Sequence, residues 1–255
     1  MSTARIIAIA NHKGGVGKTT TAVSLATDLA QMGHRSLLID LDAQANATTT
    51  LMSDEPRETI YGALRGLYPL PKRQVRAALD IVPSSLDLAG IDLEIGSVMS
   101  REYLLADLLE PERSAYEYII IDTAPSLGLL TINAFTAAHE VIIPLTAEAL
   151  PSRGLIKLEE IVAATTKRLN RGLIVSGILL TRYNAQKKLT KVVEEAIRAR
   201  YGAKVYEATI RENVAIAEAP FSLKAVGEYS PSSNGAKDYH AFTLEFLQRQ
   251  EGAAR

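Results

Sequence analysis

The 255-residue sequence contains no cysteine, and this absence excludes several kinds of chemistry at once. Without thiols the chain can form no disulfide framework, no thiolate zinc site and no cysteine nucleophile. The composition therefore fits a reducing compartment, and we expect a cytoplasmic protein. The four histidines are scattered along the chain without the spacing of a metal site.

Long hydrophobic runs are also missing. Nowhere do 18 apolar residues follow one another, and the apolar part of the opening stretch MSTARIIAIA is too short for a signal peptide or a membrane span. The C-terminal stretch AKDYHAFTLEFLQRQ lacks the cluster of lysines and arginines of an amphipathic membrane anchor. We therefore expect this stretch to pack on the protein as a helix, and we expect no stable membrane association.

Net charge is nearly absent, at −1, but the charges are unevenly distributed. Between Arg182 and Arg211 there are eight lysines and arginines and three glutamates, so this segment carries a charge of +5. A local excess of this size suits a polyanionic partner.

The residues that are plentiful are those of a globular protein, 47% hydrophobic and 22% charged. We expect a single domain over residues 1–250 and a short flexible tail over 251–255. Short β-branched runs, typical of parallel strands buried on both faces, alternate with helical patterns. The strand runs are 5–10, 35–41, 116–122, 140–145 and 173–180, and the helical patterns are 18–33, 126–138, 152–169, 187–201 and 236–250.

This alternation predicts an α/β fold in three layers, with a twisted, mostly parallel sheet flanked by helices on both faces. Residues 53–113 are less regular and contain five prolines. They predict several short helices around a strand near the sequence LDIVP. We interpret this segment as an insertion at the edge of the sheet.

The stretch NHKGGVGKTT, residues 11–20, follows the first strand and opens the first helix. The strict phosphate-loop pattern G-x-x-x-x-G-K-[ST] fails, because His12 stands at its first position, but its end is intact. Glycines at 14, 15 and 17 let backbone N–H groups turn around an anion, and the helix N-terminus adds its positive dipole. A glycine-rich turn that binds nothing is the alternative interpretation.

The loop predicts the phosphate contacts of a P-loop NTPase. We expect Lys18 to reach the β- and γ-phosphates of a nucleotide and the Thr19 hydroxyl to ligate Mg²⁺. The residues of the loop expected to contact the nucleotide are Gly14, Gly15, Val16, Gly17, Lys18, Thr19 and Thr20.

Carboxylates follow two of the predicted strands. Asp122 ends the run YEYIIID, where a Walker B aspartate projects from the carboxyl edge of the sheet toward Mg²⁺. Asp40 and Asp42 close the second strand, and two like charges at a strand end require a nearby cation. We therefore expect Mg²⁺, held by Thr19 and Asp122, and the Lys18 ammonium to lie near these carboxylates. An aspartate that only caps a loop is the alternative for Asp42 and Asp122.

Three strings, KGGVGKTT, LIDLDAQAN (38–46) and YIIIDTAPSLGLLTINA (118–134), closely resemble the motifs of the ParA/MinD family of deviant Walker A ATPases. Within it the chain is most similar to the ParA-like (Soj-like) chromosome and plasmid partition ATPases. The resemblance runs from about residue 4 to 248 and includes the string SNGAKDY.

The resemblance implies a slow, Mg²⁺-dependent ATPase that hydrolyses ATP to ADP and phosphate. Lys13 would cross a homodimer interface to the phosphates of the other subunit, and Lys18 would act within its own subunit. Asp42 would position the water, and Asp40 would belong to the Mg²⁺ site with Thr19 and Asp122. An exposed lysine at a strand end is the alternative for Lys13. The ATP-bound homodimer would bind non-specific DNA on the nucleoid, and a ParB-like adaptor would stimulate hydrolysis to segregate or position DNA cargo.

The family also implies where the base binds. The string LLTRYN (179–184) matches its adenine-binding strand end, so Asn184 is the implied base contact. Many relatives then read I-P-R-N-V, whereas this chain reads IRENV at 210–214. Arg211 therefore stands where a proline often lines the adenine pocket.

The basic segment predicts an amphipathic helix. Helical spacing places Leu189, Val192, Val193, Ala196 and Ile197 toward the core. This leaves the side chains of Lys187, Lys188, Lys191, Arg198 and Arg200 nearer solvent. Their i,i+4 glutamates favour a solvated, salt-bridged helix, whereas the resemblance implies DNA contacts.

Two other functions remain open within the family. One is a MinD-like, membrane-associated regulator of the division site, which the C-terminal stretch disfavours. The other is a ParA-like protein that positions protein cargo.

Overall fold

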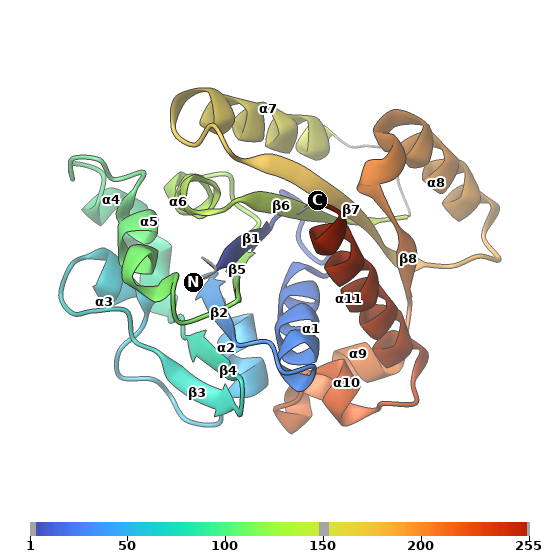
Figure 1. Cartoon of the computed structure of the whole chain (residues 1–255), viewed down its shortest axis with the longest axis horizontal. Coiled ribbons are helices and arrows are strands. Elements are labelled where there is room, and N and C mark those ends of the chain that lie inside the picture. The colour runs from blue at the N-terminus through green and yellow to red at the C-terminus, as the bar shows by residue number, and fades with distance from the viewer. Residues whose placement is uncertain (1–3, 148–152, 254–255) are drawn as a thin grey trace.

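The computed structural model describes residues 4–147 and 153–253, which are built around one eight-stranded sheet (Figure 1). The strands lie in the order β3-β4-β2-β5-β1-β6-β7-β8, and all neighbours are parallel except β3 and β4. The strands are β1 (Arg5–Ile9), β2 (Ser36–Leu41), β3 (Arg73–Arg76), β4 (Leu79–Val82), β5 (Tyr118–Thr123), β6 (Glu140–Thr146), β7 (Ile174–Tyr183) and β8 (Val205–Arg211). The predicted α/β fold with a mostly parallel sheet is confirmed.

Helices cover both faces of the sheet (Figure 1). They are α1 (Lys18–Gln31), α2 (Asn46–Leu51), α3 (Ile60–Leu64), α4 (Ile91–Glu94), α5 (Leu104–Leu109), α6 (Leu129–Ala137), α7 (Arg153–Arg168), α8 (Lys188–Tyr201), α9 (Val214–Glu218), α10 (Val226–Tyr229) and α11 (Asn234–Ala253). Four 3₁₀ turns complete the described part: η1 (Leu86–Gly90), η2 (Glu110–Glu112), η3 (Gly202–Lys204) and η4 (Ala219–Ser222).

Alternation along the strands divides the core into two layers. In β1, Ile7 and Ile9 belong to the apolar cluster under α1 and α11, whereas Ile6 and Ala8 belong to the cluster under α5, α6 and α7. Successive side chains of a strand point to opposite faces, so a strand covered on both sides must be apolar throughout. This is why the buried runs are legible as parallel strands in the sequence.

All five predicted strand runs correspond to strands, and β4 is the strand expected near LDIVP. The segment around it supplies several short helices at the sheet edge, as predicted, and in addition the strand β3. The sequence did not predict β3 or β8. Both are edge strands, and β8 carries exposed Glu207 and Arg211 among its buried residues, so its apolar pattern is interrupted.

The C-terminal helix is longer than the sequence indicates. Tyr239, Phe242 and Phe246 are buried along α11, which confirms the expected packing of this stretch. The helix continues to Ala253, so residues 251–253 of the predicted flexible tail are helical. Residues 254–255 lie outside the described residues, as does residue 152 of the helix predicted at 152–169.

Close approach of β7 to an aromatic side chain gives a test of this packing. A Cβ added to Gly177 would overlap the ring of Tyr206, which is buried and packs edge-on against Phe242 with ring centroids 4.8 Å apart. Gly177→Ala should therefore lower the free energy of unfolding in urea by about 1–3 kcal/mol through overpacking. The matched control is Gly172→Ala, where the nearest atom is an ordinary 3.6 Å away. Equal unfolding curves for the two variants would contradict this packing.

Candidate functional site

The loop between β1 and α1 wraps around the start of the helix. Gly15 and Gly17 have φ angles of +71° and +86°, in the left-handed region that favours glycine. Gly17 is the residue immediately before α1, so the N–H groups of the loop and of the first helical turn face the same side. This arrangement forms an anion site at a helix N-terminus, as the sequence predicts.

Hydrogen bonds of Asn11 within the loop, and of two side chains from distant parts of the sequence, hold the loop and the start of α1 in place. Thr181 of β7 donates a hydrogen bond from Oγ1 to the carbonyl of Val16 at 2.9 Å. The Asn11 amide donates to the carbonyl of Pro144 at 2.7 Å. The side-chain oxygen of Asn11 accepts from the backbone N–H of Lys13 at 3.0 Å. Tyr239 of α11 shares a 3.3 Å hydrogen bond between its hydroxyl and that of Thr21 in α1.

None of these supporting side chains was identified from the sequence. Thr181 lies within the string LLTRYN and Tyr239 within SNGAKDY, so both stood in recognised motifs. Their roles depend on contacts across 165 and 218 residues of sequence, which no local pattern contains.

Lys18 is turned into the protein. Its side chain is buried, and Nζ donates to the carbonyl of Lys13 at 3.2 Å. Burial lowers its pKa, and the charges of Asp122 and Asp42 oppose this by raising it. The ammonium group therefore lies over the loop, close to the carboxylates and to the position that a bound phosphate would take.

Asp122 at the end of β5 is fully buried, and within the described residues neither of its carboxylate oxygens accepts a hydrogen bond. The Thr19 hydroxyl faces this carboxylate and lowers its pKa without reaching hydrogen-bond geometry. Burial, followed by the neighbouring charge of Asp40, raises the pKa of Asp122 well above its ordinary value. A buried, unpaired carboxylate is costly, and a bound cation removes that cost.

Asp40 and Asp42 lie side by side at the end of β2 but have different surroundings. The Asp40 carboxylate accepts from the N–H and hydroxyl of Thr48 at 2.8 and 2.7 Å, and from the Asp42 N–H at 3.3 Å. Burial raises the pKa of Asp40 to about 6. Asp42 faces the loop and accepts from the Gln44 N–H at 3.0 Å. Both oxygens of Asp40 are therefore engaged within the chain, and its metal contact stays a prediction.

The donor set fits Mg²⁺ shared with a nucleotide. Within residues 4–147 and 153–253, no three histidine, cysteine, aspartate or glutamate side chains are arranged so that they could hold a metal by themselves. Mg²⁺ ordinarily keeps several waters and takes one or two carboxylates plus substrate phosphates. The side chains of Thr19 and Asp122 would hold such an ion from the protein side.

A cavity of about 750 Å³ extends from the loop toward the end of β8. Its far end is lined by Arg182, Arg211 and the start of α9. Arg211 is held in place by Asp238 of α11, which accepts from its Nε and Nη2 at 2.9 and 2.6 Å. The guanidinium of Arg211 therefore forms a fixed wall of the cavity.

The predicted base contact Asn184 is placed differently. Among the described residues it does not line this cavity, and its side-chain oxygen accepts from the Gln186 N–H at 3.0 Å. It therefore caps its own loop, and its contact with a base stays a prediction.

The basic helix α8 follows the carboxyl end of β7, on the same edge of the sheet as the phosphate loop. Thr190, Val193 and Ile197 are its buried residues, whereas Leu189 and Val192 are 57% and 55% exposed. The expectation that Leu189 and Val192 face the core is therefore wrong. The helix lies over the edge strands, where a narrow i, i+3, i+7 stripe suffices to cover them.

The five predicted DNA-binding cations differ in their surroundings. Arg198 bonds to Glu194 at 2.9 Å and Glu207 at 3.2 Å, and Arg200 bonds to Glu159 at 2.7 Å. Lys187 lies 3.9 Å from Glu212. Lys188 and Lys191 are exposed and form no ion pair within the described residues. The last two are the cations of this helix that are freest to meet a polyanion.

A phosphate loop and buried strand-end carboxylates at the carboxyl edge of a parallel sheet define a P-loop nucleotide-binding protein. A family model described as an AAA domain matches residues 4–175. The chain is 40% identical over 253 residues to the chromosome partitioning protein ParA of Caulobacter vibrioides, covering 96% of this chain and 95% of ParA. It is 41% identical over 240 residues to the sporulation initiation inhibitor Soj of Bacillus subtilis, covering 92% and 95%. The chain belongs to the ParA/Soj family of P-loop partition ATPases.

Solved structures agree with this assignment. Cobyrinic acid a,c-diamide synthase from Mycobacterium smegmatis, with a bound ATP analogue and magnesium, superposes with a TM-score of 0.86 at 30% identity, covering 98% of this chain and 97% of that one. A plasmid partition protein from Borrelia burgdorferi bound to AMPPNP gives a TM-score of 0.81 at 26% identity, covering 96% of this chain and 99% of that one.

Within the described residues, no helix is long and apolar enough to cross a membrane.

The unpaired carboxylate of Asp122 gives a prediction about stability. Because burial raises its pKa, the folded state is favoured when this group is protonated, and this contribution is lost as the pH rises above the ordinary aspartate value of 3.8. Without nucleotide or metal, Asp122→Asn should therefore raise the free energy of unfolding at pH 8 by about 1–3 kcal/mol. The gain should shrink toward pH 4 in urea titrations.

The same variant should lose Mg²⁺-dependent nucleotide binding, measured with a fluorescent ATP analogue. The matched control is Asp54→Asn, which neutralises a carboxylate that is 59% exposed and paired with Arg73. An Asp122→Asn protein less stable than the wild type at pH 8 would argue against an unpaired charge at this position.

Proposed function

We propose that the chain is an ATP-switched DNA-partition protein. Mg·ATP joins two copies into a homodimer, the dimer binds DNA without sequence preference on the nucleoid, and hydrolysis of ATP to ADP and phosphate releases it. A ParB-like adaptor on the cargo stimulates the hydrolysis. The observation that carries the proposal is the second lysine of the loop, Lys13, in a chain 40% identical to a ParA protein.

The two loop lysines point to separate tasks. Lys18 is buried and turned over its own loop, where it would bind the β- and γ-phosphates of its own nucleotide. Lys13 is exposed, and Asn11 fixes only its backbone N–H. An exposed ammonium on a fixed backbone is suited to a phosphate bound by a second subunit. Two cations from two chains on one triphosphate would make dimerisation depend on the γ-phosphate.

The position of Asp42 supports a role in hydrolysis. It faces the same cavity as the loop, it lies close enough to raise the pKa of Lys18, and it is only 7% exposed. A carboxylate placed there would orient the attacking water beside the γ-phosphate. Mg²⁺ held from Thr19 and Asp122 would neutralise charge on the phosphates.

The basic helix supports the DNA step. The side chains of Lys187, Lys188 and Lys191 lie at the start of α8, directly after the strand whose Thr181 holds the phosphate loop. These lysines therefore stand at the nucleotide edge of the sheet. A dimer that joins two such edges would bring two sets of lysines to one DNA duplex and strengthen phosphate binding.

Lys13→Ala should bind ATP but fail to dimerise, because the cation offered to the second nucleotide is missing. Multi-angle light scattering with a non-hydrolysable ATP analogue measures this directly. The expected result is a monomer for the variant and a dimer for the wild type. The proposal would be wrong if the variant formed dimers as the wild type does.

Asp42→Ala is the matched control for that experiment. It should dimerise with ATP but hydrolyse it at least about a hundredfold more slowly, since a positioned acid or base contributes about that much. A variant that hydrolyses ATP at the wild-type rate would remove Asp42 from the reaction.

The DNA step is tested by reversing the charges of Lys187, Lys188 and Lys191 to glutamate. Binding to random-sequence DNA in ATP should weaken, and the slope of log affinity against log salt should fall by about three for each protomer. The control replaces the exposed residues Lys167, Arg168 and Arg171 by glutamate. It changes the charge by the same amount, but at the amino ends of the strands. If the control loses as much affinity for DNA as the α8 variant, Lys187, Lys188 and Lys191 are not a specific DNA-binding surface.

A further inference from the structure

The nucleotide cavity ends, away from the phosphate loop, in a group of side chains that the phosphate chemistry described above does not use. It is lined there by Ile210 and Arg211 of β8 and by Asn213, Val214 and Ile216 at the start of α9. Ile210, Val214 and Ile216 are apolar and suit the faces of a flat heterocycle. Arg211 and Asn213 carry hydrogen-bond donors for its edge. A mostly apolar lining with a few polar groups is typical of a pocket for a nucleotide base.

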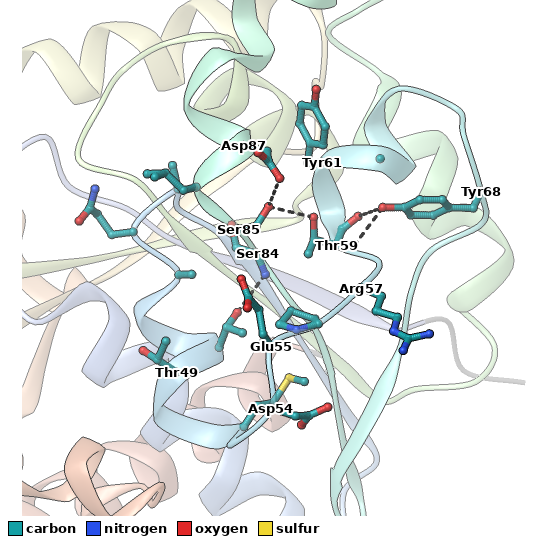
Figure 2. A pocket seen from close by; sticks show the side chains of 18 of the residues that line it. Thr49, Asp54, Glu55, Arg57, Thr59, Tyr61, Tyr68, Ser84, Ser85 and Asp87 are labelled. Carbon is teal, nitrogen blue, oxygen red and sulfur yellow. Dashed lines mark hydrogen bonds between the residues drawn. The ribbon is translucent and has the colours of Figure 1, made fainter.

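A second cavity, of about 700 Å³, lies on the other side of Gln44, which lines both cavities (Figure 2). Among the described residues, none from the phosphate loop (14–20) lines this second cavity. Figure 2 shows polar groups of its wall bonded to one another, as between the Tyr68 hydroxyl and the backbone of Thr59. A nucleotide whose phosphates lie on the loop therefore extends within the first cavity, toward Arg211.

One carboxylate fixes Arg211 in place. Asp238 of α11 accepts from the backbone N–H of Arg211 at 2.9 Å, and from its Nε and Nη2 at 2.9 and 2.6 Å. Asp238 is only 9% exposed, although the Arg211 side chain is 46% exposed. Within the described residues, Nη1 of Arg211 has no hydrogen-bond partner. A guanidinium held in this way offers its free donors to a ligand with little further loss of conformational entropy.

The same turn of α11 supports the phosphate end of the cavity. Tyr239, the residue after Asp238, shares a hydrogen bond with Thr21 of α1. Its hydroxyl also lies only 3.6 Å from the position of a Cβ added to Gly17 in the phosphate loop. Two consecutive residues of one helix therefore set where the Arg211 guanidinium stands relative to the phosphates.

A guanidinium can only donate hydrogen bonds, so the ligand atom that meets Arg211 must be an acceptor. On the adenine ring the acceptors are the nitrogens N1, N3 and N7, whereas the 6-amino group is a donor. A base that turned this amino group toward Arg211 would set donor against donor, at a cost in free energy. Arg211 therefore restricts both which base is bound and how it is oriented.

We propose that Arg211, positioned by Asp238, recognises the base of the bound nucleotide by donating a hydrogen bond to one ring nitrogen of adenine. Asp238 acts as a positioning residue and does not need to touch the nucleotide. The contact rests on the nucleotide site of the proposed function, but it requires neither dimerisation nor hydrolysis.

The test compares ADP with its 1-deaza, 3-deaza and 7-deaza analogues, in each of which a C–H group replaces one ring nitrogen. With Mg²⁺ present, the four nucleotides compete against a fluorescent ADP that is labelled on its ribose and has an unchanged base. ADP is used because the proposed dimer requires the γ-phosphate. With the wild type, one analogue should bind about fivefold or more weakly than ADP, which corresponds to the loss of one hydrogen bond, and the other two should bind within about twofold of ADP.

Three variants assign the contact. Arg211→Met keeps an apolar stem but removes the donors, so all four nucleotides should bind it with the same, weakened affinity. Asp238→Asn should also bring the ratio between ADP and the discriminated analogue toward one, because the guanidinium is no longer held; a merely structural role of Asp238 would weaken all four nucleotides alike and leave that ratio unchanged. The matched control is Arg182→Met, which removes another arginine from the same end of the cavity, one paired with Glu212, and should keep the ratio of the wild type.

Equal binding of the four nucleotides to the wild type, or an unchanged ratio in Arg211→Met, would overturn the contact. A ratio of one in Arg182→Met as well would refute its assignment to Arg211, and an unchanged ratio in Asp238→Asn would refute the positioning role. A wild type that binds neither ADP nor ATP would refute the contact together with the proposed function. One that discriminates among the ADP analogues through Arg211 but stays monomeric in ATP would refute the proposed dimer and leave the base contact intact.

Discussion

Negative charge buried at the carboxyl edge of the sheet is the constraint on which the rest of this molecule depends. Parallel pairing brings the ends of β2 and β5 together, so Asp40 and Asp122 become direct neighbours in register. Burial opposes ionisation of both; hydrogen bonds from Thr48 favour the charged form of Asp40, and the Lys18 ammonium together with a bound cation favours that of Asp122. The buried negative charge is therefore most destabilising when no ligand neutralises it, which is common at functional sites.

Asp40, Asp42 and Asp122 lie at the same edge of the sheet but have different roles. Asp40 is satisfied by Thr48 and by the backbone of Asp42, and its role in the structure is to fix the entry into α2. Asp122 has no such partners among the described residues and is open to a metal ion. Asp42 faces the cavity and is held by its own loop. Identical carboxyl groups therefore differ through the donors that surround them.

Local pattern was enough to predict the interior strands and the phosphate loop. The reason is that a strand covered on both faces must be apolar throughout, and a loop around an anion needs glycine where φ is positive, as at Gly15 and Gly17. The edge strand β8 was missed because its exposed side chains break the apolar run. In α8 the pattern predicted the helix and the burial of Val193 and Ile197 correctly, but Thr190 is buried in place of Leu189. Contacts such as Thr181 to Val16 join residues too distant for any pattern to display.

The hydrogen bonds from Thr181 and Tyr239 to the phosphate loop and α1 also bear on how the protein is made. The loop leaves the ribosome well before β7 and α11, whose partner residues lie 165 and 218 residues further along the chain. A nascent chain therefore carries an unfinished nucleotide site until both elements have been synthesised. The hydrogen bonds that support the loop can form only from that point on.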